Sequence, residues 1–259
     1  MPEIKKFLAF DTSTDRMSIA LTDGVRVWQH SGAGGAQASA TLIPAILALL
    51  ADAGLALGQL DAIAFGRGPG SFAGLRTACA VAQGLAFGAN GGAGIPVLPI
   101  DTLMAVAEEA RFQQHQVAGS PSGESVLRVT ALLDARMDEM YVQRYEFHGD
   151  ACVPLGDCEL VRPENLVPEP ATGLWAGNVF GVYADRLPAG LASLTRLEAL
   201  PTATAMLRLV PALAAAGHCV DAALALPIYV RDKVALTTDE RAEVKARAAL
   251  AALSAANPA

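Results

Sequence analysis

The stretch Phe65-Gly-Arg-Gly-Pro-Gly-Ser-Phe-Ala-Gly-Leu-Arg76 lies between two apolar segments of this 259-residue chain. The run before it, residues 61–65, predicts a short buried strand, and the segment after it, residues 72–89, predicts a helix. Small, turn-forming residues connect the two: Gly66, Gly68, Pro69, Gly70 and Ser71. Glycine permits positive φ or close backbone approach, and a serine before a helix is a natural N-cap. The stretch therefore predicts a strand, a tight turn and a helix in succession.

This glycine turn has two interpretations. A helix N-terminus behind a glycine turn can bind an anion, so a phosphate contact is one of them. However, no Lys follows as in a Walker loop, and the third glycine of a dinucleotide pattern falls at position 74 instead of 73. A tight strand-to-helix turn without a ligand is the other interpretation. The residues of the turn leave both open.

Two predicted helices are apolar on nearly every side. They are residues 72–89, which carry a stripe of small residues at four-residue spacing, and Thr41–Ala53. A helix of this kind must be buried on more faces than its own sheet can cover. We therefore expect a partner to cover the remaining faces. The expected interface residues are Leu42, Ile46, Leu49, Phe72, Ala73, Arg76, Ala80 and Gly84.

Four motifs together resemble the TsaB (YeaZ) family. They are the opening stretch, Leu8-Ala-Phe-Asp-Thr-Ser-Thr14, Asp134-Ala-Arg-Met-Asp-Glu-Met-Tyr141 and Pro227-Ile-Tyr-Val-Arg-Asp-Lys-Val-Ala235. The family usually has Thr where this chain has Ala73, and often a His where it has Ala38. The resemblance implies a non-catalytic scaffold subunit of the bacterial complex that adds a threonylcarbamoyl group to adenosine in tRNA.

The resemblance also implies partners. A TsaD-like homologue would hold the metal and transfer the group, a TsaE-like protein would supply an ATPase, and docking on the homologue would use the N-terminal half of this chain. Self-association of the isolated chain stays open. The resemblance implies that this chain holds no cofactor or metal of its own, and that ATP and magnesium would bind only at a complex interface. It also implies that the chain contacts tRNA only indirectly.

Composition agrees with a cytoplasmic globular protein. The net charge is −7, which disfavours direct gripping of nucleic acid phosphates. Mean hydropathy is high at +0.36, yet no apolar run reaches the ~18–20 residues of a membrane span, and the N-terminus does not match a signal peptide. The four cysteines and four histidines show no metal-ligand spacing. No metal site or membrane association is therefore expected.

An internal repeat predicts the domain organisation. Leu133-Asp134-x-x-x-Asp138-x-Met140 has the same spacing as Phe10-Asp11-x-x-x-Asp15-x-Met17, each between two predicted strands. This favours an α/β fold of two ribonuclease-H-like halves, each a mixed sheet with flanking helices, as in the actin/sugar-kinase superfamily. The predicted boundaries are residues 1–112, a linker at 113–125, and 126–259 with its final segment packing back on the first half.

The two Asp loops offer a second function. In that superfamily such loops face one cleft and hold nucleotide phosphates, which makes Asp11, Thr12 and Asp134 candidate phosphate-binding residues. A small-molecule kinase or ATPase using Asp11 and Asp134 is thus the alternative, although the first loop is equally interpretable as a self-bonded turn. Neither loop contains the glycine that brings backbone close to phosphate. Peptidase chemistry is the weakest interpretation, because no Ser–His pattern is visible.

Overall fold

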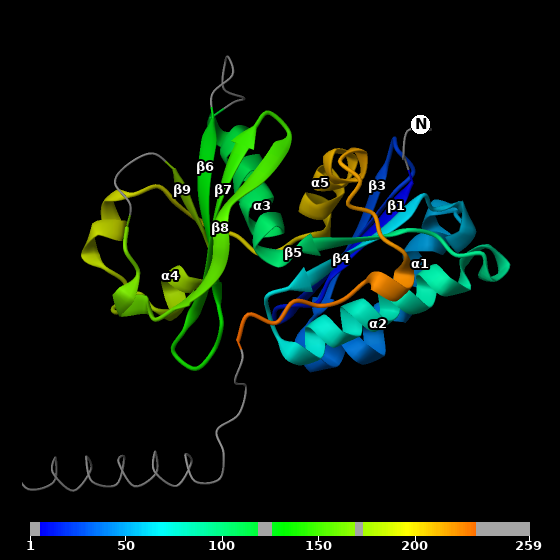
Figure 1. Cartoon of the computed structure of the whole chain (residues 1–259), viewed down its shortest axis with the longest axis horizontal. Helices are drawn as coiled ribbons and strands as arrows, with labels where there is room; N and C mark the ends of the chain where they lie inside the picture. The colour runs from blue at the N-terminus through cyan, green and yellow to red at the C-terminus, as the bar shows by residue number, and fades with distance from the viewer. Residues whose placement is uncertain (1–5, 119–125, 169–172, 232–259) are drawn as a thin grey trace, which may run out of the picture. The chain divides into compact units, whose positions relative to one another are not determined.

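The computed structural model describes residues 6–118, 126–168 and 173–231. Within the compact unit Met1–Tyr229, these residues form two five-stranded mixed sheets with helices around and between them (Figure 1). None of the helices in these ranges has both the length and the apolar character needed to cross a membrane.

The first sheet has the strand order β3-β2-β1-β4-β5. Its strands are β1 (Phe7–Asp11), β2 (Arg16–Thr22), β3 (Val27–Ala33), β4 (Ala62–Gly68) and β5 (Val97–Asp101). The first three strands pair antiparallel, and β4 and β5 continue the sheet in parallel with β1. All five residues of β1 are buried, because both faces of this central strand are covered. The carboxyl ends of β1, β4 and β5 therefore meet at one edge.

The second sheet repeats this arrangement, with the order β10-β9-β6-β7-β8. Its strands are β6 (Leu127–Asp134), β7 (Met140–His148), β8 (Ala151–Val161), β9 (Leu174–Gly177) and β10 (Arg196–Glu198). Again three strands pair antiparallel and two follow in parallel. Asp134 ends β6 as Asp11 ends β1. The predicted fold class, two ribonuclease-H-like halves with mixed sheets, is confirmed.

Helices α1 (Ala38–Ala53) and α2 (Phe72–Gly88) cover one face of the first sheet. Their inward residues pack in one core with side chains of β1 and β2 such as Phe10 and Ile19. Helix α1 begins three residues before the predicted Thr41. The short α4 (Val179–Val182) packs on the second sheet.

Helices α3 (Thr102–Ala118) and α5 (Ala203–Ala215) lie between the two sheets (Figure 1). Helix α3 follows the first sheet but packs on β6, whereas α5 follows the second sheet and packs on β1 and β2. Buried Glu108 of α3 accepts hydrogen bonds from Arg111 and from Arg208 of α5, each at 2.7 Å. This exchange of helices joins the two lobes, which we define as the two sheets with the helices packed on their outer faces.

The predicted boundaries need correction at one point. Helix α3 continues to Ala118, so residues 113–118 of the predicted linker are helical. The chain after the second sheet contacts the first lobe: Val220 forms a bridge with Val97, and the Ile228 amide donates to the Arg67 carbonyl at 2.7 Å. Residues 232–259 of the predicted final segment, for which the sequence favours an amphipathic helix at 238–253, lie outside the described ranges.

Candidate functional site

The glycine turn after β4 packs directly on the loop that follows β1. A Cβ atom at Gly66 would overlap the Asp11 carboxylate, and one at Gly74 would overlap the Thr12 carbonyl oxygen. The Ser71 amide donates to the Ser13 carbonyl at 2.7 Å. Ser71 occupies the predicted N-cap position of α2, but its side chain makes no capping hydrogen bond. The glycines thus serve close packing of this turn on the first Asp loop, which favours the tight-turn interpretation.

Asp11 and Thr12, two of the predicted phosphate-binding residues, are fully buried. The Asp11 carboxylate accepts hydrogen bonds from the Ser13 amide (2.9 Å) and hydroxyl (2.7 Å) and from the Thr102 hydroxyl (3.5 Å). The Thr12 hydroxyl donates to the Gly74 carbonyl at 2.7 Å. Burial raises the pKa of Asp11 to about 6, and the Ser13 hydrogen bonds oppose this rise. Both side chains are therefore bonded within the chain.

Asp134, the third candidate, lies at the end of β6 and is partly exposed. Its carboxylate accepts hydrogen bonds from the Tyr183 hydroxyl at 2.7 Å and from the Arg136 amide at 2.9 Å. Burial, followed by this hydrogen bond to Asp134, raises the pKa of Tyr183. The Asp134 amide donates to the side-chain oxygen of Asn178 at 2.9 Å. Sequence reasoning missed Tyr183, because an isolated aromatic carries no pattern.

The two Asp loops face each other, as predicted, across a small cavity. Its volume is about 70 Å³, against ~300–1,000 Å³ for typical small-molecule sites. The Arg136 guanidinium crosses from the second lobe to the Asp15 carboxylate, with nitrogen–oxygen distances of 2.7 and 2.9 Å. These residues do not fit a nucleotide, because the room is small and the carboxylates already have partners. Among the described residues, no three His, Cys, Asp or Glu side chains are grouped to hold a metal ion.

The predicted interface residues divide into two sets. Leu42, Ile46 and Leu49 were expected on the surface of α1, but they are buried in the core of the first lobe. In contrast, four of the residues predicted on α2 are exposed: Ala73, Arg76, Ala80 and Gly84. The prediction failed for α1 because a helix that is apolar on all sides does not reveal which side faces its own sheet.

The exposed apolar residues of α1 and α2 include three that the sequence analysis did not name. These are Ile43, Leu47 and Phe87, with exposed fractions of 43%, 53% and 53%. A Cβ at Gly84 or Gly88 would have no atom within 4 Å. We call the following exposed residues the α1–α2 face: Ile43, Leu47, Ala73, Arg76, Ala80, Gly84, Phe87 and Gly88. It is an apolar surface with room for close approach of another backbone.

The segment after the short turn η6 (Ala222–Leu224) covers another side of α2. The Cys79 thiol and the Gln83 amide donate to the Ala225 carbonyl. The Phe72 ring, half-buried, stacks on Tyr229 with ring centroids 4.5 Å apart. Part of the apolar surface of α2 is thus covered by this chain itself, and Phe72 lies at the border of that part.

Comparisons with known proteins identify the family of this chain. Residues 34–215 match the family model described as TsaD, tRNA N6-adenosine threonylcarbamoyltransferase. The tRNA threonylcarbamoyladenosine biosynthesis protein TsaB of Haemophilus influenzae is 36% identical over 88% of this chain and 94% of its own length. TsaB of Escherichia coli is 31% identical over 89% of this chain and 96% of its own length. The chain belongs to the TsaB (YeaZ) family.

Solved structures agree with this family. YeaZ from Pseudomonas aeruginosa superposes with a TM-score of 0.72 at 35% identity, covering 87% of this chain and 99% of that one. A second Pseudomonas aeruginosa structure, titled as a protein with similarity to peptidase YEAZ, gives a TM-score of 0.73 at 36% identity with the same coverage. The chain is therefore a TsaB-family protein, and that family acts in the biosynthesis of tRNA threonylcarbamoyladenosine.

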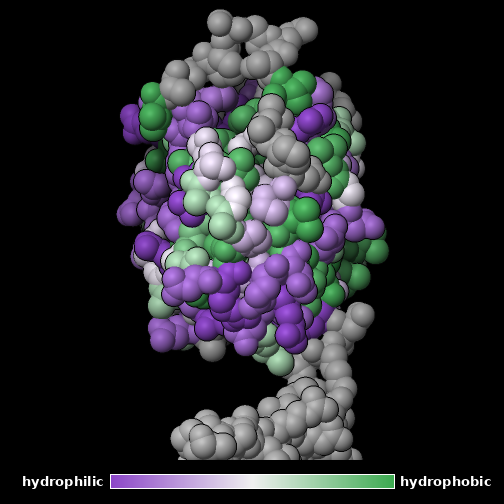
Figure 2. Space-filling model, turned by 90° about the vertical axis from the view of Figure 1, so that its left-hand side faces the viewer, coloured by the Kyte–Doolittle hydropathy of each residue, from purple (hydrophilic) through white to green (hydrophobic). Residues whose placement is uncertain are grey.

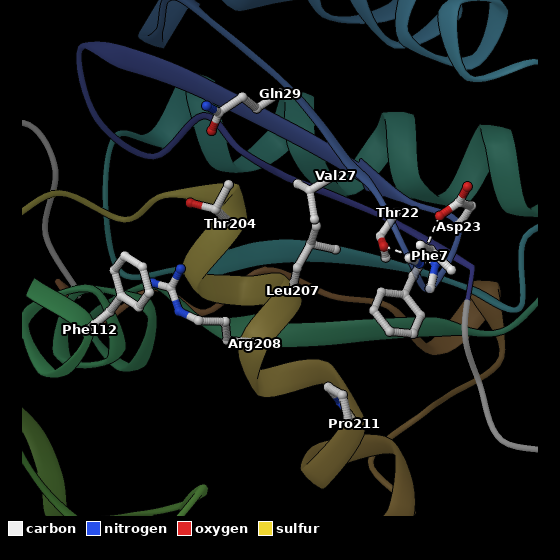
Figure 3. A pocket seen from close by; sticks show the side chains of 12 residues that line it. Phe7, Thr22, Asp23, Val27, Gln29, Phe112, Thr204, Leu207, Arg208 and Pro211 are labelled. Carbon is white, nitrogen blue, oxygen red and sulfur yellow. Dashed lines mark hydrogen bonds between the residues drawn. The ribbon is translucent and has the colours of Figure 1, made fainter. Parts of the chain in front are cut away.

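This TsaB-family chain also has a larger cavity on the other face of the first sheet. Its volume is about 830 Å³, and α5, the β2–β3 turn and the end of α3 surround it (Figure 3). The Arg208 guanidinium at its wall lies 4.1 Å from the Phe112 ring centroid and pairs with Glu108 and Glu109. The charge of Arg208 is thus neutralised inside the chain, and the walls are formed mainly by carbon, including Phe7 and Val27.

The surface of the second lobe differs from the α1–α2 face. Figure 2 shows a hydrophilic band across the lower part of the described surface on that side, with hydrophobic residues scattered above it. Exposed apolar side chains there, such as Val153 and Val182, belong to different elements. The α1–α2 face instead gathers its apolar residues on two adjacent helices.

Proposed function

We propose that this chain is a non-catalytic scaffold subunit of the cytoplasmic complex that adds a threonylcarbamoyl group to adenosine in tRNA. It docks through the α1–α2 face on a TsaD-like homologue, which performs the transfer. A TsaE-like ATPase joins the complex, and tRNA is bound mainly by the partners. In the isolated chain, the same face is available to a second copy.

The exposure of the α1–α2 face supports this proposal most directly. Ile43, Leu47 and Phe87 are large apolar side chains with about half of their surface in water. Contiguous exposed apolar surface usually marks an interaction site. The exposed small residues beside them allow a facing helix to approach closely. Two helices of a homologous fold are a suitable partner, because they would complete a four-helix bundle.

The Asp loops and the net charge support a non-catalytic role. Asp11 is buried and bonded by its own chain, and Asp134 is bonded by Tyr183, so neither carboxylate is offered to a substrate. The net charge of −7 disfavours tight binding of tRNA by this subunit alone. No observation favours the kinase or ATPase alternative over the scaffold.

The substitution Gly84→Leu tests the docking. The leucine side chain enters open space in the isolated subunit, so the melting temperature is expected to stay equal or to rise slightly, since leucine is the better helix former. At a packed interface the same side chain overpacks, which typically costs about 1–3 kcal/mol. We expect the dissociation constant for the purified TsaD-like partner to rise about five- to more than a hundredfold. Calorimetric titration and thermal melting measure the two effects.

Gly181→Leu is the matched control. Gly181 is also open to solvent, but it lies in α4 on the second lobe. Its substitution is expected to leave the partner affinity unchanged. If the Gly84→Leu variant bound the partner with unaltered affinity, docking through the α1–α2 face would be refuted. A large decrease in the melting temperature of this variant would contradict the open environment of Gly84.

A further inference from the structure

The second Asp loop contains a strained turn. Three consecutive residues that are not glycine, Arg136, Met137 and Asp138, have φ values of 61°, 56° and 61°. Side chains of L-residues crowd the backbone in this left-handed region, which such residues visit mostly one at a time. Surrounding contacts must therefore hold the turn in place, and their identity indicates what the turn does.

Contacts from both lobes hold this turn. Within the second lobe, the Ala135 amide donates to the Glu139 carbonyl at 2.9 Å, and Asp138 pairs with Arg186 at 2.6 Å. From the first lobe, the Asp15 carboxylate accepts both hydrogen bonds of the Arg136 guanidinium described above. Asp15 and Arg136 thus join the two Asp loops directly.

The Asp15–Arg136 pair is exposed to solvent. The exposed side-chain fractions are 80% for Asp15 and 69% for Arg136. Exposed ion pairs are weak and are screened by salt. The contact can therefore open without unfolding the lobes, which α3 and α5 join independently through buried Glu108.

The charges around the small cavity show what the contact does when closed. Its charged lining residues are Asp15, Asp134 and Arg136. The guanidinium of Arg136 lies 4.0 Å from Asp134 and 2.7 Å from Asp15, so it is shared by two carboxylates. In this arrangement the cavity offers no uncompensated positive charge to an anionic ligand, and the Arg136 side chain spans the space between the loops.

We propose that the Arg136–Asp15 pair is a reversible latch between the two lobes. Closed, it holds the two Asp loops together and keeps the cleft between them filled. Opened, it frees the tips of both loops, around Asp15 and Arg136, at once. The exposure of both side chains to water keeps the latch near the point of opening. This inference does not depend on docking through the α1–α2 face.

Hydrogen exchange measured by mass spectrometry tests the latch on the full chain. In Arg136→Gln and in Asp15→Asn, we expect amide exchange to accelerate about two- to fivefold in both loops, residues 11–18 and 133–141. The double variant should exchange no faster than either single one, because one contact is lost in all three. In ~1 M salt, exchange in the wild type should accelerate in the same loops, and the double variant should not change.

Arg128→Gln is the matched control. Arg128, whose side chain is 60% exposed, pairs with Glu146 at 2.7 Å, but both residues lie in the second lobe. Its loss should leave the first-lobe loop unchanged. The latch proposal would be overturned if Arg136→Gln accelerated exchange only in residues 133–141. It would also be overturned if the effects of the two single variants added in the double variant. Unchanged exchange in both single variants would overturn it as well.

Discussion

The two Asp loops have the same sequence spacing but opposite surroundings. The first loop places Asp11 in a fully buried environment, with hydrogen bonds from Ser13 and Thr102. The second leaves Asp134 partly exposed beside Arg136, with a hydrogen bond from Tyr183. The spacing determines the strand-turn-strand unit in both lobes. The difference in the surroundings of the two carboxylates comes mainly from residues distant in the sequence, such as Thr102 and Tyr183.

A difference in backbone packing causes this contrast. The glycine turn and the start of α2 press on the first loop, since Gly66 and Gly74 leave no room for a side chain against Asp11 and Thr12. At the second loop, the position beyond β9 is occupied by Asn178, which meets the loop through its side-chain oxygen. The inner part of the first loop, residues 11–13, is consequently sealed by close packing, and the second loop is held by side chains at the surface.

The largest expected effect comes from Gly74→Ala, which breaks the sealing of the first loop. The added Cβ would overlap the Thr12 carbonyl oxygen, which belongs to backbone and cannot rotate away. We expect the free energy of unfolding to fall by about 3 kcal/mol, at the upper end for overpacking. Urea denaturation of the isolated chain measures it.

Gly84→Ala in the same helix is the control for this substitution. The Cβ of the new alanine would lie in open space. Helix propensity alone should therefore act, and it should raise the unfolding free energy by up to about 1 kcal/mol. If Gly74→Ala raised the unfolding free energy as Gly84→Ala does, α2 would not be packed tightly on the first loop.

Asp11→Asn is expected to have the next largest effect, and the effect depends on pH. Burial raises the pKa of Asp11 from 3.8 to about 6, so the folded state favours the protonated carboxyl. This stabilisation is fully present below pH 3.8 and is lost as the pH rises through 6. Asparagine stays neutral and can still accept from Ser13, so the variant should be more stable than wild type at pH 7 by up to about 3 kcal/mol, the free energy that corresponds to this pKa shift.

The difference between Asp11→Asn and wild type should shrink towards zero as the pH falls to 4. Comparing the two proteins at each pH cancels the effects of other carboxylates, such as Glu146, whose pKa is lowered mainly by the hydrogen bond from Arg128. Urea titrations between pH 4 and 7 measure the difference. A constant difference across this range would show that Asp11 does not titrate in the folded protein as its burial requires.

The sequence predicted the duplicated fold because the signals involved are local. Each strand is a short apolar or alternating run, and each acidic turn has the same spacing, so the repeat of Asp11 and Asp134 identified two equivalent units. The same signals predicted that α1 and α2 have more apolar surface than their own sheet can cover. They did not distinguish buried Leu42 from exposed Ile43, because both are apolar and adjacent.

Contacts between distant residues could not be predicted in this way. Arg136 and Asp15 are 121 positions apart, and Phe72 and Tyr229 lie on α2 and on the segment that returns after α5. The exchange of α3 and α5 between the lobes likewise depends on tertiary packing. Periodicity describes one element at a time, so it carries no information about which elements meet.

The smallest expected effect, from Met137→Asn, concerns the strained turn of the second loop. Met137 has a φ of 56° and a side chain that is 57% exposed. Asparagine tolerates the left-handed region better than methionine, and the substitution leaves the flanking ion pairs of Arg136 and Asp138 in place. We expect the free energy of unfolding to rise by about 0.5 kcal/mol. Met137→Ala is the matched control, because it removes the same side chain without favouring positive φ. Urea titrations of both variants beside wild type measure the effect, and an asparagine variant no more stable than the alanine variant would mean that the turn is not strained in solution.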